Sequence, residues 1–268
     1  MMKLFSILFS IILFTYVPLL AQKNNIDQII VPLSTPLEGG IIVINHHKGA
    51  IKITGFEGDV IIVNASLRYK NITQPDHGLK QIRPNLIQLE AEEHDNEVTI
   101  RTNSLQKTID LDIQVPNNFS VRIQKYDIGP VEVQNLRGEM DISNVDGDII
   151  VSHISGSAVL NTVDGNIRAV FAEVTPNLPM AFTSVEGKIE IVLPAFTKAI
   201  ARMKTDNGEI FTDFKMDIQP RQTKTEKDKQ SDTFRIKLDD WIYGKINGGG
   251  PEFMIKSFNG SIYLRSRD

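Results

Sequence analysis

Apolar residues recur at fixed offsets from a row of glycines between residues 129 and 170. The segment reads GPVEVQNLRGEMDISNVDGDIIVSHISGSAVLNTVDGNIRAV, and its glycines are nine residues apart. Two, four and seven residues after each glycine the chain carries an aliphatic residue or Met, whereas the residue directly after the glycine is polar or proline. Alternation with a period of two is typical of a β-strand with one buried face. Each unit is therefore predicted to consist of one strand and one turn.

The same turn occurs outside this segment. Gly40, Gly49 and Gly58 are again nine residues apart and are followed by Ile or Val two and four residues later. Later glycines are spaced more widely, and the step from Gly187 to Gly208 predicts one full coil with a longer loop. Glycine suits such turns because it adopts positive φ without steric cost. The predicted turn glycines are Gly40, Gly49, Gly58, Gly129, Gly138, Gly147, Gly156, Gly165, Gly187, Gly208 and Gly260.

Two all-β architectures contain a strand and a turn in nine residues. An antiparallel meander tolerates variable turns, whereas a coil stacks equivalent residues and needs the same residue class at each position. The strict repetition favours the coil. We therefore predict a parallel β-helix, or β-solenoid, built from nine-residue strand–turn units. Two parallel sheets would face each other across a narrow aliphatic core, with the right-handed sense that is usual for parallel crossovers.

Residues 1–21 have the pattern of a secretory signal peptide. Lys3 precedes an apolar run from Leu4 to Leu20, and Ala21 is the predicted last residue before cleavage. The apolar run is long for a signal, so an uncleaved membrane anchor is the alternative. We expect the mature protein to be exported, to the periplasm, the outer cell surface or the medium.

The mature chain is predicted to form one domain. Residues 22–37 form a lead-in, and residues 38–268 form a single solenoid. The segment 64–128 is less regular, and we expect it to continue the coil with wider loops. The segment QPRQTKTEKDKQSD, residues 219–232, is polar and lacks apolar periodicity, so we expect an exposed polar loop there.

The composition excludes several kinds of chemistry and of partner. The sequence contains no cysteine, which excludes disulfides and a thiol nucleophile. Without the leader the chain has 28 Lys and Arg against 33 Asp and Glu, a net charge of −5. A nucleic-acid partner would require clustered basic residues on one face, and we expect none. A secreted domain without disulfides must be stable through its core alone, which a regular repeat of this length allows.

Four stretches together resemble a known family. They are the G-x-I-x-I units, the Val115–Pro116 strand end, VLPAFTKAIARMKTDNGEIFTDF (192–214) and INGGGPEFMIKSFNGSIYLR (246–265). The chain resembles bacterial putative-adhesin proteins of the β-strand-repeat kind over about residues 38–268. The Gly-Gly-Gly-Pro turn followed by Asn-Gly is the most specific element. The resemblance implies a parallel β-helix-like fold and an exported protein, and it supplies no catalytic residues to transfer.

The histidines do not predict a metal site. His46 and His47 are adjacent, and neighbours on a strand point to opposite faces, so they do not readily share one ion. His47 takes the offset that an apolar residue fills in other units, which indicates a histidine at the edge of the core. His77, His94 and His153 stand alone, without the spacing of a zinc motif.

Calcium is the other metal to consider, because calcium-binding β-rolls also use nine-residue units. The acidic stretch 90–97 and the carboxylates of Asp146, Asp148 and Asp164 are the available oxygens. Calcium β-rolls need the pattern G-G-x-G-x-D, whereas each unit here has one glycine. Asp-Gly turns explain these residues without an ion. We therefore predict no metal and no cofactor.

An enzyme on this fold would need placed carboxylates, as in polysaccharide lyases and glycosidases. Glu132, Asp141 and Arg168 share one outward offset, but other units carry Ile150 and Val159 there, so no charged row is sustained. The sequence contains no motif of a serine hydrolase, a nucleotide-binding loop or a dinucleotide fold. We predict no catalytic residues.

Trp241 and Tyr243 stand beside the Gly-rich turn, and two hypotheses account for them. Exposed aromatic rings could stack on a ligand such as a sugar, so these two residues are the candidate ligand contacts. Alternatively they cap the C-terminal end of the coil, which must be covered to prevent edge pairing. The capping hypothesis is favoured.

These observations favour an exported, non-catalytic solenoid with an adhesin-like binding or structural role in the cell envelope. The expected partner is an envelope or host polysaccharide or a protein. One alternative is a carbohydrate-active β-helix enzyme, and another is an envelope stress or signalling accessory that binds a protein. The exposed residues Glu132, Asp141, Arg168 and Lys188 and the segment 219–232 are the places to look for contacts.

Overall fold

The structure is a computed structural model that describes residues 26–68, 87–102, 104–219, 223–227, 234–238 and 240–268. The predicted signal peptide lies outside these residues. All regular elements among the described residues are β-strands. Within these same ranges, no helix is long and apolar enough to cross a membrane.

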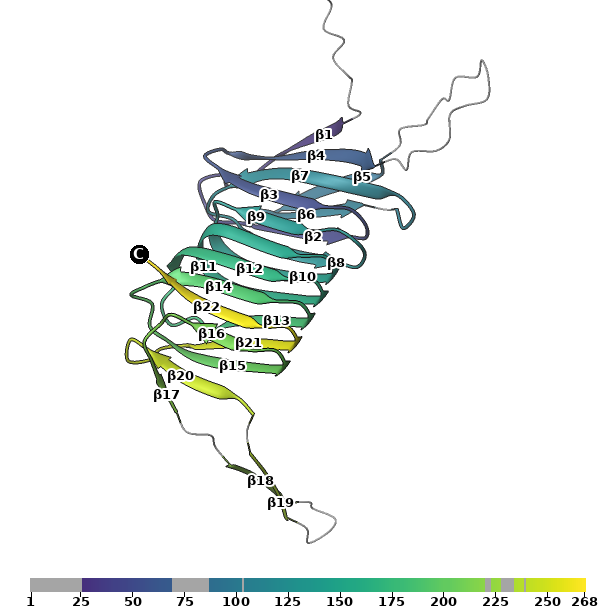
Figure 1. Ribbon diagram of the computed structural model, residues 1–268. Coiled ribbons are helices and arrows are strands. Elements are labelled where there is room, and N and C mark those ends of the chain that lie inside the picture. The colour runs from purple at the N-terminus through teal and green to yellow at the C-terminus, as the bar shows by residue number, and fades with distance from the viewer. Residues whose placement is uncertain (1–25, 69–86, 103, 220–222, 228–233, 239) are drawn as a thin grey trace, which may run out of the picture.

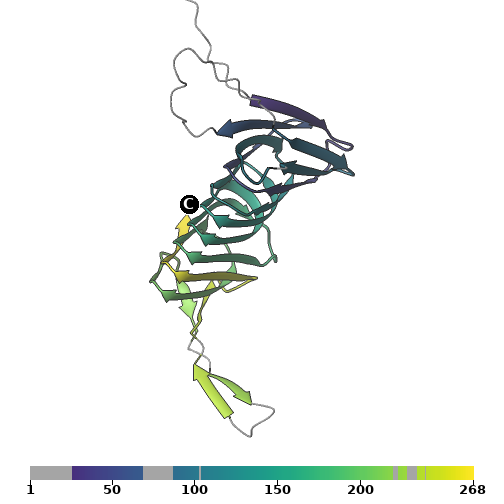
Figure 2. The same ribbon diagram turned by 90° about the vertical axis from the view of Figure 1, so that its right-hand side faces the viewer.

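Twenty of the strands form one sheet that winds into an elongated body with two strand stacks (Figure 1; Figure 2). The first stack is, in spatial order, β1 (Ile26–Pro32), β4 (Val60–Arg68), β7 (Thr108–Pro116), β3 (Ile51–Phe56), β9 (Val131–Gln134), the start of β11 (Ile149–Asp164), β12 (Ile167–Val174), β14 (Ile189–Pro194), β22 (Ile262–Arg267) and β16 (Ile210–Thr212). The second stack is β5 (Leu89–His94), β6 (Glu97–Thr102), β2 (Ile41–His46), β8 (Ser120–Lys125), β10 (Arg137–Asp146), the end of β11, β13 (Met180–Glu186), β21 (Glu252–Asn259), β15 (Ala199–Asn207), β20 (Ile242–Ile246) and β17 (Met216–Ile218).

Strands in the middle of both stacks are parallel, and their register follows the glycine spacing. Ile149 pairs with Val131 on one side and with Ile167 on the other, and Met140 pairs with Ala158. Each of these partners is 18 residues away, twice the glycine spacing. One turn of the solenoid, which we call a rung, thus contributes one strand to each stack. The all-β, solenoid-like architecture is as predicted.

The rungs do not follow one another in sequence order at either end. The C-terminal rung, β21–β22, lies between the rung β13–β14 and the rung β15–β16. Likewise β2–β3 lies between β6–β7 and β8–β9. Between Gly187 and Gly208 the chain makes one full turn, through β14 and β15, as predicted. The two turns that carry these glycines are not adjacent, however, because the rung that carries Gly260 lies between them. Figure 1 shows the yellow C-terminal strands among the green ones.

Antiparallel strands cover both ends of the parallel stacks. At one end β1 pairs with β4, β4 with β7, and β5 with β6. At the other end β15 pairs with β20, and β20 with β17. The expected continuation of the coil through 64–128 holds for β6, β7 and β8, whereas β4 and β5 run against their neighbours. Residues 26–32 of the predicted lead-in form β1, which belongs to the sheet.

The core consists of the residues two and four positions after the turn glycines, as predicted for most units. Val131, Met140, Ile149 and Leu160, for example, are all fully buried. The unit after Gly58 is shifted by one residue, since Ile61 and Val63 are buried in place of Val60 and Ile62. This shift accompanies the reversal of β4, which leaves the parallel coil.

The residue seven positions after each glycine differs in solvent exposure between the two halves of a rung. Leu136 and Ile154 are buried, whereas Val145 and Val163 are 41% and 48% exposed. The second pair lies at the corner that follows the second stack, just before Gly147 and Gly165. The two corners are therefore not equivalent, although the sequence pattern is the same.

Glycines line that corner because each turn touches the next one. A Cβ on Gly147 would lie 2.3 Å from the carbonyl oxygen of Gly129, and one on Gly165 would lie 2.2 Å from that of Gly147. Both glycines also have positive φ, as has Gly187. The row of touching turns runs through Gly49, Gly129, Gly147, Gly165, Gly187, Gly260 and Gly208. Gly138 and Gly156 form a corresponding contact at the opposite corner, and Gly58 lies in neither row.

Inside the glycine corner, a row of polar side chains satisfies the carbonyl groups of the turns. Asn144 Nδ2 donates to the oxygens of Gly129 and Gly147 at 3.1 and 2.8 Å. Ser184 Oγ donates to Gly165 O at 2.9 Å. The row consists of Thr102, His46, Lys125, Asn144, Thr162, Ser184, Ser257 and Thr205, which are neighbours in register. Buried polar groups are stable only when they are hydrogen-bonded, so this row fixes the corner.

The predicted polar loop contains regular structure. Within 219–232, residues 223–227 form β18 (Thr223–Lys227), which pairs antiparallel with β19 (Phe234–Leu238). The sequence alternates Thr with charged residues over this stretch, which suits a strand. In both views this hairpin projects from the end of the body (Figure 1; Figure 2). The remaining residues of 219–232, apart from Gln219, lie outside the described residues, as do the side chains of the hairpin.

Candidate functional site

A charged cluster stands on the outer face of the first stack. Arg168 on β12 and Glu190 on β14 are neighbours in register, and Tyr263 on β22 follows Glu190. Lys188 precedes β14, and Arg265 lies two residues beyond Tyr263. Successive residues of a strand alternate between its two faces, so Arg168, Glu190, Tyr263 and Arg265 all point away from the core. We call these residues, together with Phe211 on β16, the front-face cluster.

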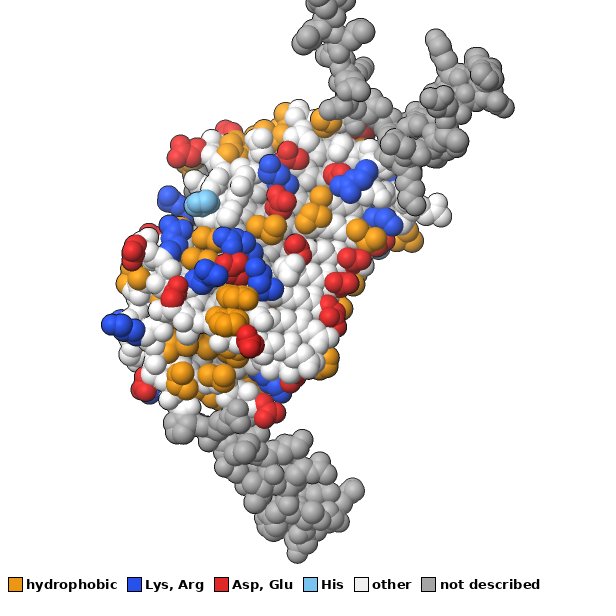
Figure 3. Space-filling view, viewed as in Figure 1, with side chains coloured by type: hydrophobic (Ala, Val, Ile, Leu, Met, Phe, Trp, Pro, Cys, Tyr) orange, Lys and Arg blue, Asp and Glu red, His pale blue; other side chains and the backbone are white. Residues whose placement is uncertain are grey.

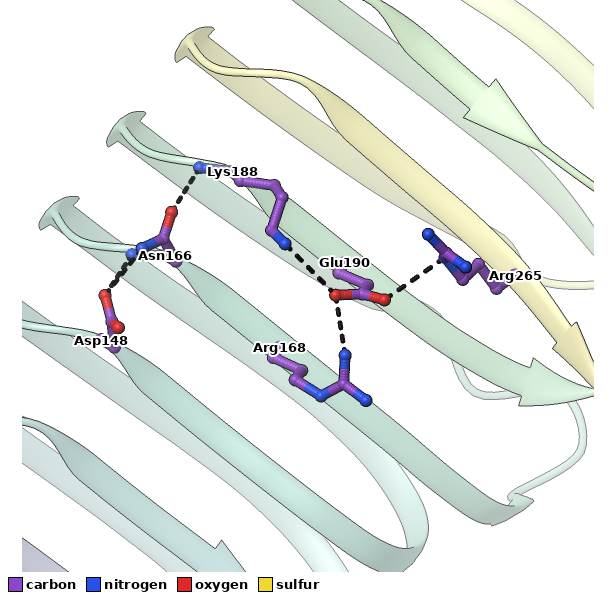
Figure 4. A network of polar contacts seen from close by, with 6 residues as sticks. All are labelled: Asp148, Asn166, Arg168, Lys188, Glu190 and Arg265. Carbon is purple, nitrogen blue, oxygen red and sulfur yellow. Dashed lines mark hydrogen bonds and ion pairs between the residues drawn. The ribbon is translucent and has the colours of Figure 1, made fainter.

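Glu190 is the centre of the cluster and accepts contacts from three cations (Figure 4). Arg168 Nη1 lies 2.7 Å and Lys188 Nζ lies 3.4 Å from Glu190 Oε2, and Arg265 Nε lies 3.3 Å from Oε1. Glu190 is 8% exposed, whereas about half of each cationic side chain is exposed. The cluster therefore presents cations to solvent above a shielded carboxylate.

Electrostatics keep Glu190 ionised. Partial burial alone would raise the pKa of its carboxyl group, but the hydrogen bond and charge of Arg168 and the charge of Lys188 outweigh burial and hold the pKa below its usual value. Three cations around one carboxylate leave a local net charge of +2 on a chain whose overall charge is −4.

An aromatic pair borders the cations. The rings of Phe211 and Tyr263 are stacked, with centroids 5.0 Å apart and an interplanar angle of 16°. Lys188 Nζ lies 5.6 Å and the Arg265 guanidinium 5.7 Å from the centroid of the Tyr263 ring. Figure 3 shows blue side chains around a red one on this face, with orange side chains directly below them. The face thus combines positive charge with one exposed ring, that of Phe211, and one half-buried ring, that of Tyr263.

The structure brings together only some of the exposed residues expected from the sequence. Arg168 and Lys188 meet in the front-face cluster. Glu132 is exposed on β9 of the same stack. Asp141 lies on β10 in the second stack, where its carboxylate is 3.5 Å from Nε of Arg122. The three residues Glu132, Asp141 and Arg168 face outward as predicted, but they occupy two different faces.

Sequence reasoning missed Glu190, Arg265, Phe211 and Tyr263. The signal available in the sequence was their common offset from turn glycines, since Glu190, Tyr263 and Phe211 each stand three residues after one. Ile150 and Val159 stand at the same offset in other units, so the residues at this offset do not share one residue class.

The candidate ligand contacts Trp241 and Tyr243 lie at the C-terminal end of the stacks. The Arg202 guanidinium lies 4.1 Å from the centroid of the Trp241 ring and 5.9 Å from that of Tyr243. Tyr243 belongs to β20, which pairs with the otherwise open edge of β15. This position agrees with the favoured capping hypothesis, and a ligand contact at these rings stays a prediction.

His46 and His47 point in different directions. His46 is buried, and its Nδ1 lies 2.8 Å from Thr102 Oγ1. His47, which was expected at the edge of the core, is half-buried, and its ring lies 5.5 Å from that of Tyr126. Burial lowers the pKa of His46 to about 4. Among the described residues, no group of three or more His, Asp or Glu side chains is arranged to hold a metal ion.

The carboxylate of Asp148, one of the oxygens considered for calcium, contacts the next rung. Its Oδ1 accepts hydrogen bonds from the backbone nitrogen and from Nδ2 of Asn166, at 2.7 and 3.1 Å (Figure 4). Asn166 Oδ1 in turn accepts from the backbone nitrogen of Lys188 at 2.9 Å. These bonds link consecutive turns and position Lys188 in the front-face cluster.

The family can be assigned from the sequence. Residues 87–237 match the model of the Toastrack DUF4097 family. The chain belongs to this family. No curated protein sequence matches it. The family match covers the central rungs, including the strands that carry Arg168 and Glu190.

The chain is also similar to two solved structures. One is a putative cell adhesion protein from Clostridium sporogenes, with 11% identity and a TM-score of 0.45, covering 90% of this chain and all of the other. The second is a putative adhesin from Bacteroides fragilis, with 10% identity and a TM-score of 0.43, covering 90% of this chain and 97% of the other. The predicted resemblance to bacterial putative-adhesin proteins is confirmed by the family match, and both solved structures carry names of that kind.

Proposed function

We propose that this protein is an exported, non-catalytic, adhesin-like recognition module, and that its front-face cluster binds an acidic polymer of the cell envelope or of a host surface. The observation that carries the proposal is the excess of exposed cations over the shielded carboxylate of Glu190, beside the stacked rings of Phe211 and Tyr263. Arginine and lysine bind carboxylates and other anions through charge-assisted hydrogen bonds, and aromatic rings pack on apolar faces of a ligand.

The shape of the site supports a polymer as ligand. The cluster stands on an outer sheet face, its residues come from adjacent strands, and about half of each cationic side chain is exposed. A small ligand usually binds in a concave pocket that buries most of its surface. A repetitive acidic chain gains affinity on an open face because several of its anionic groups can be bound at once.

The arrangement of carboxylates favours binding without catalysis. Glycosidases need two carboxyl groups on either side of the bond that is cleaved, one of them protonated when it acts as an acid. Glu190 has a lowered pKa and three cationic neighbours, which suits an ionised structural carboxylate. Asp141 lies in the other stack. The proposal also includes a right-handed coil, which is the usual sense for parallel crossovers. It includes export of the chain, which rests on the pattern of residues 1–21.

A binding experiment tests the proposal. Purified residues 22–268 are titrated with polygalacturonate, and with neutral dextran as a matched polymer, while new reducing ends are recorded. We expect binding to polygalacturonate alone, weakened by added salt and without cleavage. The double variant Lys188→Gln, Arg265→Gln should bind at least about tenfold more weakly, since each charged hydrogen bond contributes roughly 1.5–3 kcal/mol.

Arg122→Gln is the control, because it removes an exposed cation from the second stack that is also paired with a carboxylate. It should leave the affinity for polygalacturonate unchanged. Equal losses in Arg122→Gln and in the double variant would contradict a specific site. New reducing ends would contradict the non-catalytic role. Export is tested separately by mass spectrometry of the mature protein, whose first residue should be Gln22.

A further inference from the structure

A groove runs along the corner of the solenoid that lies opposite the glycine corner. Three hollows of about 370, 480 and 270 Å³ lie there. Arg137 and Ser155 line both the first and the second hollow, and Val174, Thr175 and Pro176 line both the second and the third. Neighbouring hollows share lining residues, and we call the three together the corner groove.

The groove crosses successive rungs, so its long axis follows the axis of the solenoid. It begins beside Gly55 on β3, passes Arg137 and Ser155, and ends beside Phe196 and Gly250. It passes about six segments of chain, and neighbouring strands lie about 4.8 Å apart, which gives the groove a length of roughly 24 Å. An extended chain of several monomers fits this length.

The backbone at the groove is already hydrogen-bonded between rungs. Arg137 N donates to Asn117 O at 2.6 Å, Ser155 N to Leu136 O at 2.8 Å, and Thr175 N to Gly156 O at 3.1 Å. An extended peptide usually binds by adding a strand to a free sheet edge. Along this corner the strands run across the groove, so they offer no such edge. Side chains must therefore supply the contacts to any ligand.

The side chains in the groove are of mixed charge and partly apolar. Arg137 and Lys198 are interspersed with Glu139 and Glu173, and no ion pair is formed by any of these four among the described residues. Because the groove carries carboxylates as well as cations, it disfavours a polyanion, in contrast to the front-face cluster. Uncharged polar groups of a ligand can accept from the cations and donate to the carboxylates.

Two further features mark the third hollow as a binding position. Phe196 is 76% exposed, so its ring presents a free apolar face to a ligand. Thr197 also lines this hollow, and its Oγ1 is buried without a hydrogen-bond partner among the described residues. A buried hydroxyl group without a partner is unusual and costs about 1–3 kcal/mol.

We propose that this corner groove is a second binding site, which takes a neutral linear polysaccharide lying along the solenoid axis. Hydroxyl groups of the sugar chain meet the charged side chains of Arg137, Glu139 and Glu173, and the C–H face of one sugar packs on the ring of Phe196. The site is separate from the front-face cluster and does not depend on the function proposed for it.

The test uses residues 22–268 and two neutral linear probes, cellohexaose and chitohexaose, with cellobiose as the short probe. Binding is measured by calorimetry for the unaltered chain, Phe196→Ala, Arg137→Gln and Lys188→Gln. We expect one hexasaccharide to bind at least about tenfold more tightly than cellobiose, because it spans several contacts along the groove. Phe196→Ala and Arg137→Gln should each weaken that binding about tenfold.

Lys188→Gln is the matched control, since it alters the front-face cluster and leaves the groove unchanged. Thermal unfolding verifies that each variant is folded, and both groove positions are exposed, so little loss of stability is expected. The proposal is overturned if neither hexasaccharide binds, if chain length has no effect, or if Lys188→Gln alone reduces binding. If the unaltered chain binds a hexasaccharide but does not bind polygalacturonate, the front-face site is refuted and the groove site stands.

Discussion

Alanine at Gly147 should destabilise the protein through two separable effects. The first is backbone strain, because Gly147 has a φ of +129°. A non-glycine residue in a sparsely populated conformation costs about 1–3 kcal/mol. The second is a clash, since the new Cβ would lie 3.1 Å from Pro130 N and still closer to the carbonyl group of Gly129.

The magnitude follows from both effects. Overpacking typically costs about 1–3 kcal/mol. Replacing glycine also reduces the entropy of the unfolded chain, which returns about 0.4–1 kcal/mol. The expected net loss for Gly147→Ala is therefore about 2–5 kcal/mol. It would be measured by urea unfolding followed by circular dichroism.

Two other glycines separate the effects. Gly248 has a φ of +86°, but a Cβ added there would meet nothing within 4 Å, so Gly248→Ala should show strain alone. Gly138 lacks a positive φ, but its Cβ would lie 2.5 Å from Phe119 O, so Gly138→Ala should show the clash alone. The loss of stability in Gly147→Ala should be roughly the sum of the losses in Gly248→Ala and Gly138→Ala. If Gly147→Ala is no less stable than Gly248→Ala, the contact between successive turns does not require glycine.

Three further predictions concern the interior, the front-face cluster and the chain end. The pKa of His46 is lowered to about 4 and that of Lys125 to about 8, chiefly by burial. The unfolded chain therefore binds more protons than the folded one between about pH 4 and 6.5 and between about pH 8 and 10.5, so stability should rise with pH through both windows. His46→Leu should abolish the first rise and Lys125→Met the second, and unchanged pH profiles of urea midpoints would contradict the burial of these groups. Glu190→Gln should lower the free energy of unfolding, measured in urea, by about 1–2 kcal/mol, since three cations lose their shared carboxylate. The same variant should bind polygalacturonate more tightly, and weaker binding would argue against the role of net charge. Removal of residues 252–268 takes away the rung between β13 and β15 and should abolish cooperative unfolding. Replacement of 220–239 by a short linker should preserve cooperative unfolding. Equal effects of the two deletions would refute the inserted rung order.

The core and the glycine turns follow from local pattern, which is why the sequence predicts them well. Alternation decides which side chains are buried, and close contact between turns requires glycine at the corner. The order of the rungs does not follow in the same way. Each rung has the same pattern of residue classes, so the pattern identifies β21–β22 as a rung without indicating its neighbours.

The front-face cluster could be predicted only in part, for a related reason. Arg168 and Lys188 are recognisable as exposed residues after turn glycines. Arg265 is 75 residues from Glu190 in the sequence and reaches it only because β22 is inserted next to β14. The corner groove depends likewise on which turns become adjacent. Both sites therefore require knowledge of the rung order.

The most direct test of the central claim is to determine where an acidic polymer touches the protein. Polygalacturonate bound to residues 22–268 is coupled to nearby lysines by a carbodiimide, which joins a carboxylate to an amine in direct contact, and the modified peptides are mapped by mass spectrometry. The front-face cluster contains one amine, that of Lys188, so the account predicts coupling at Lys188 that disappears at high salt. Coupling confined to lysines outside the cluster, with Lys188 unmodified, would contradict it.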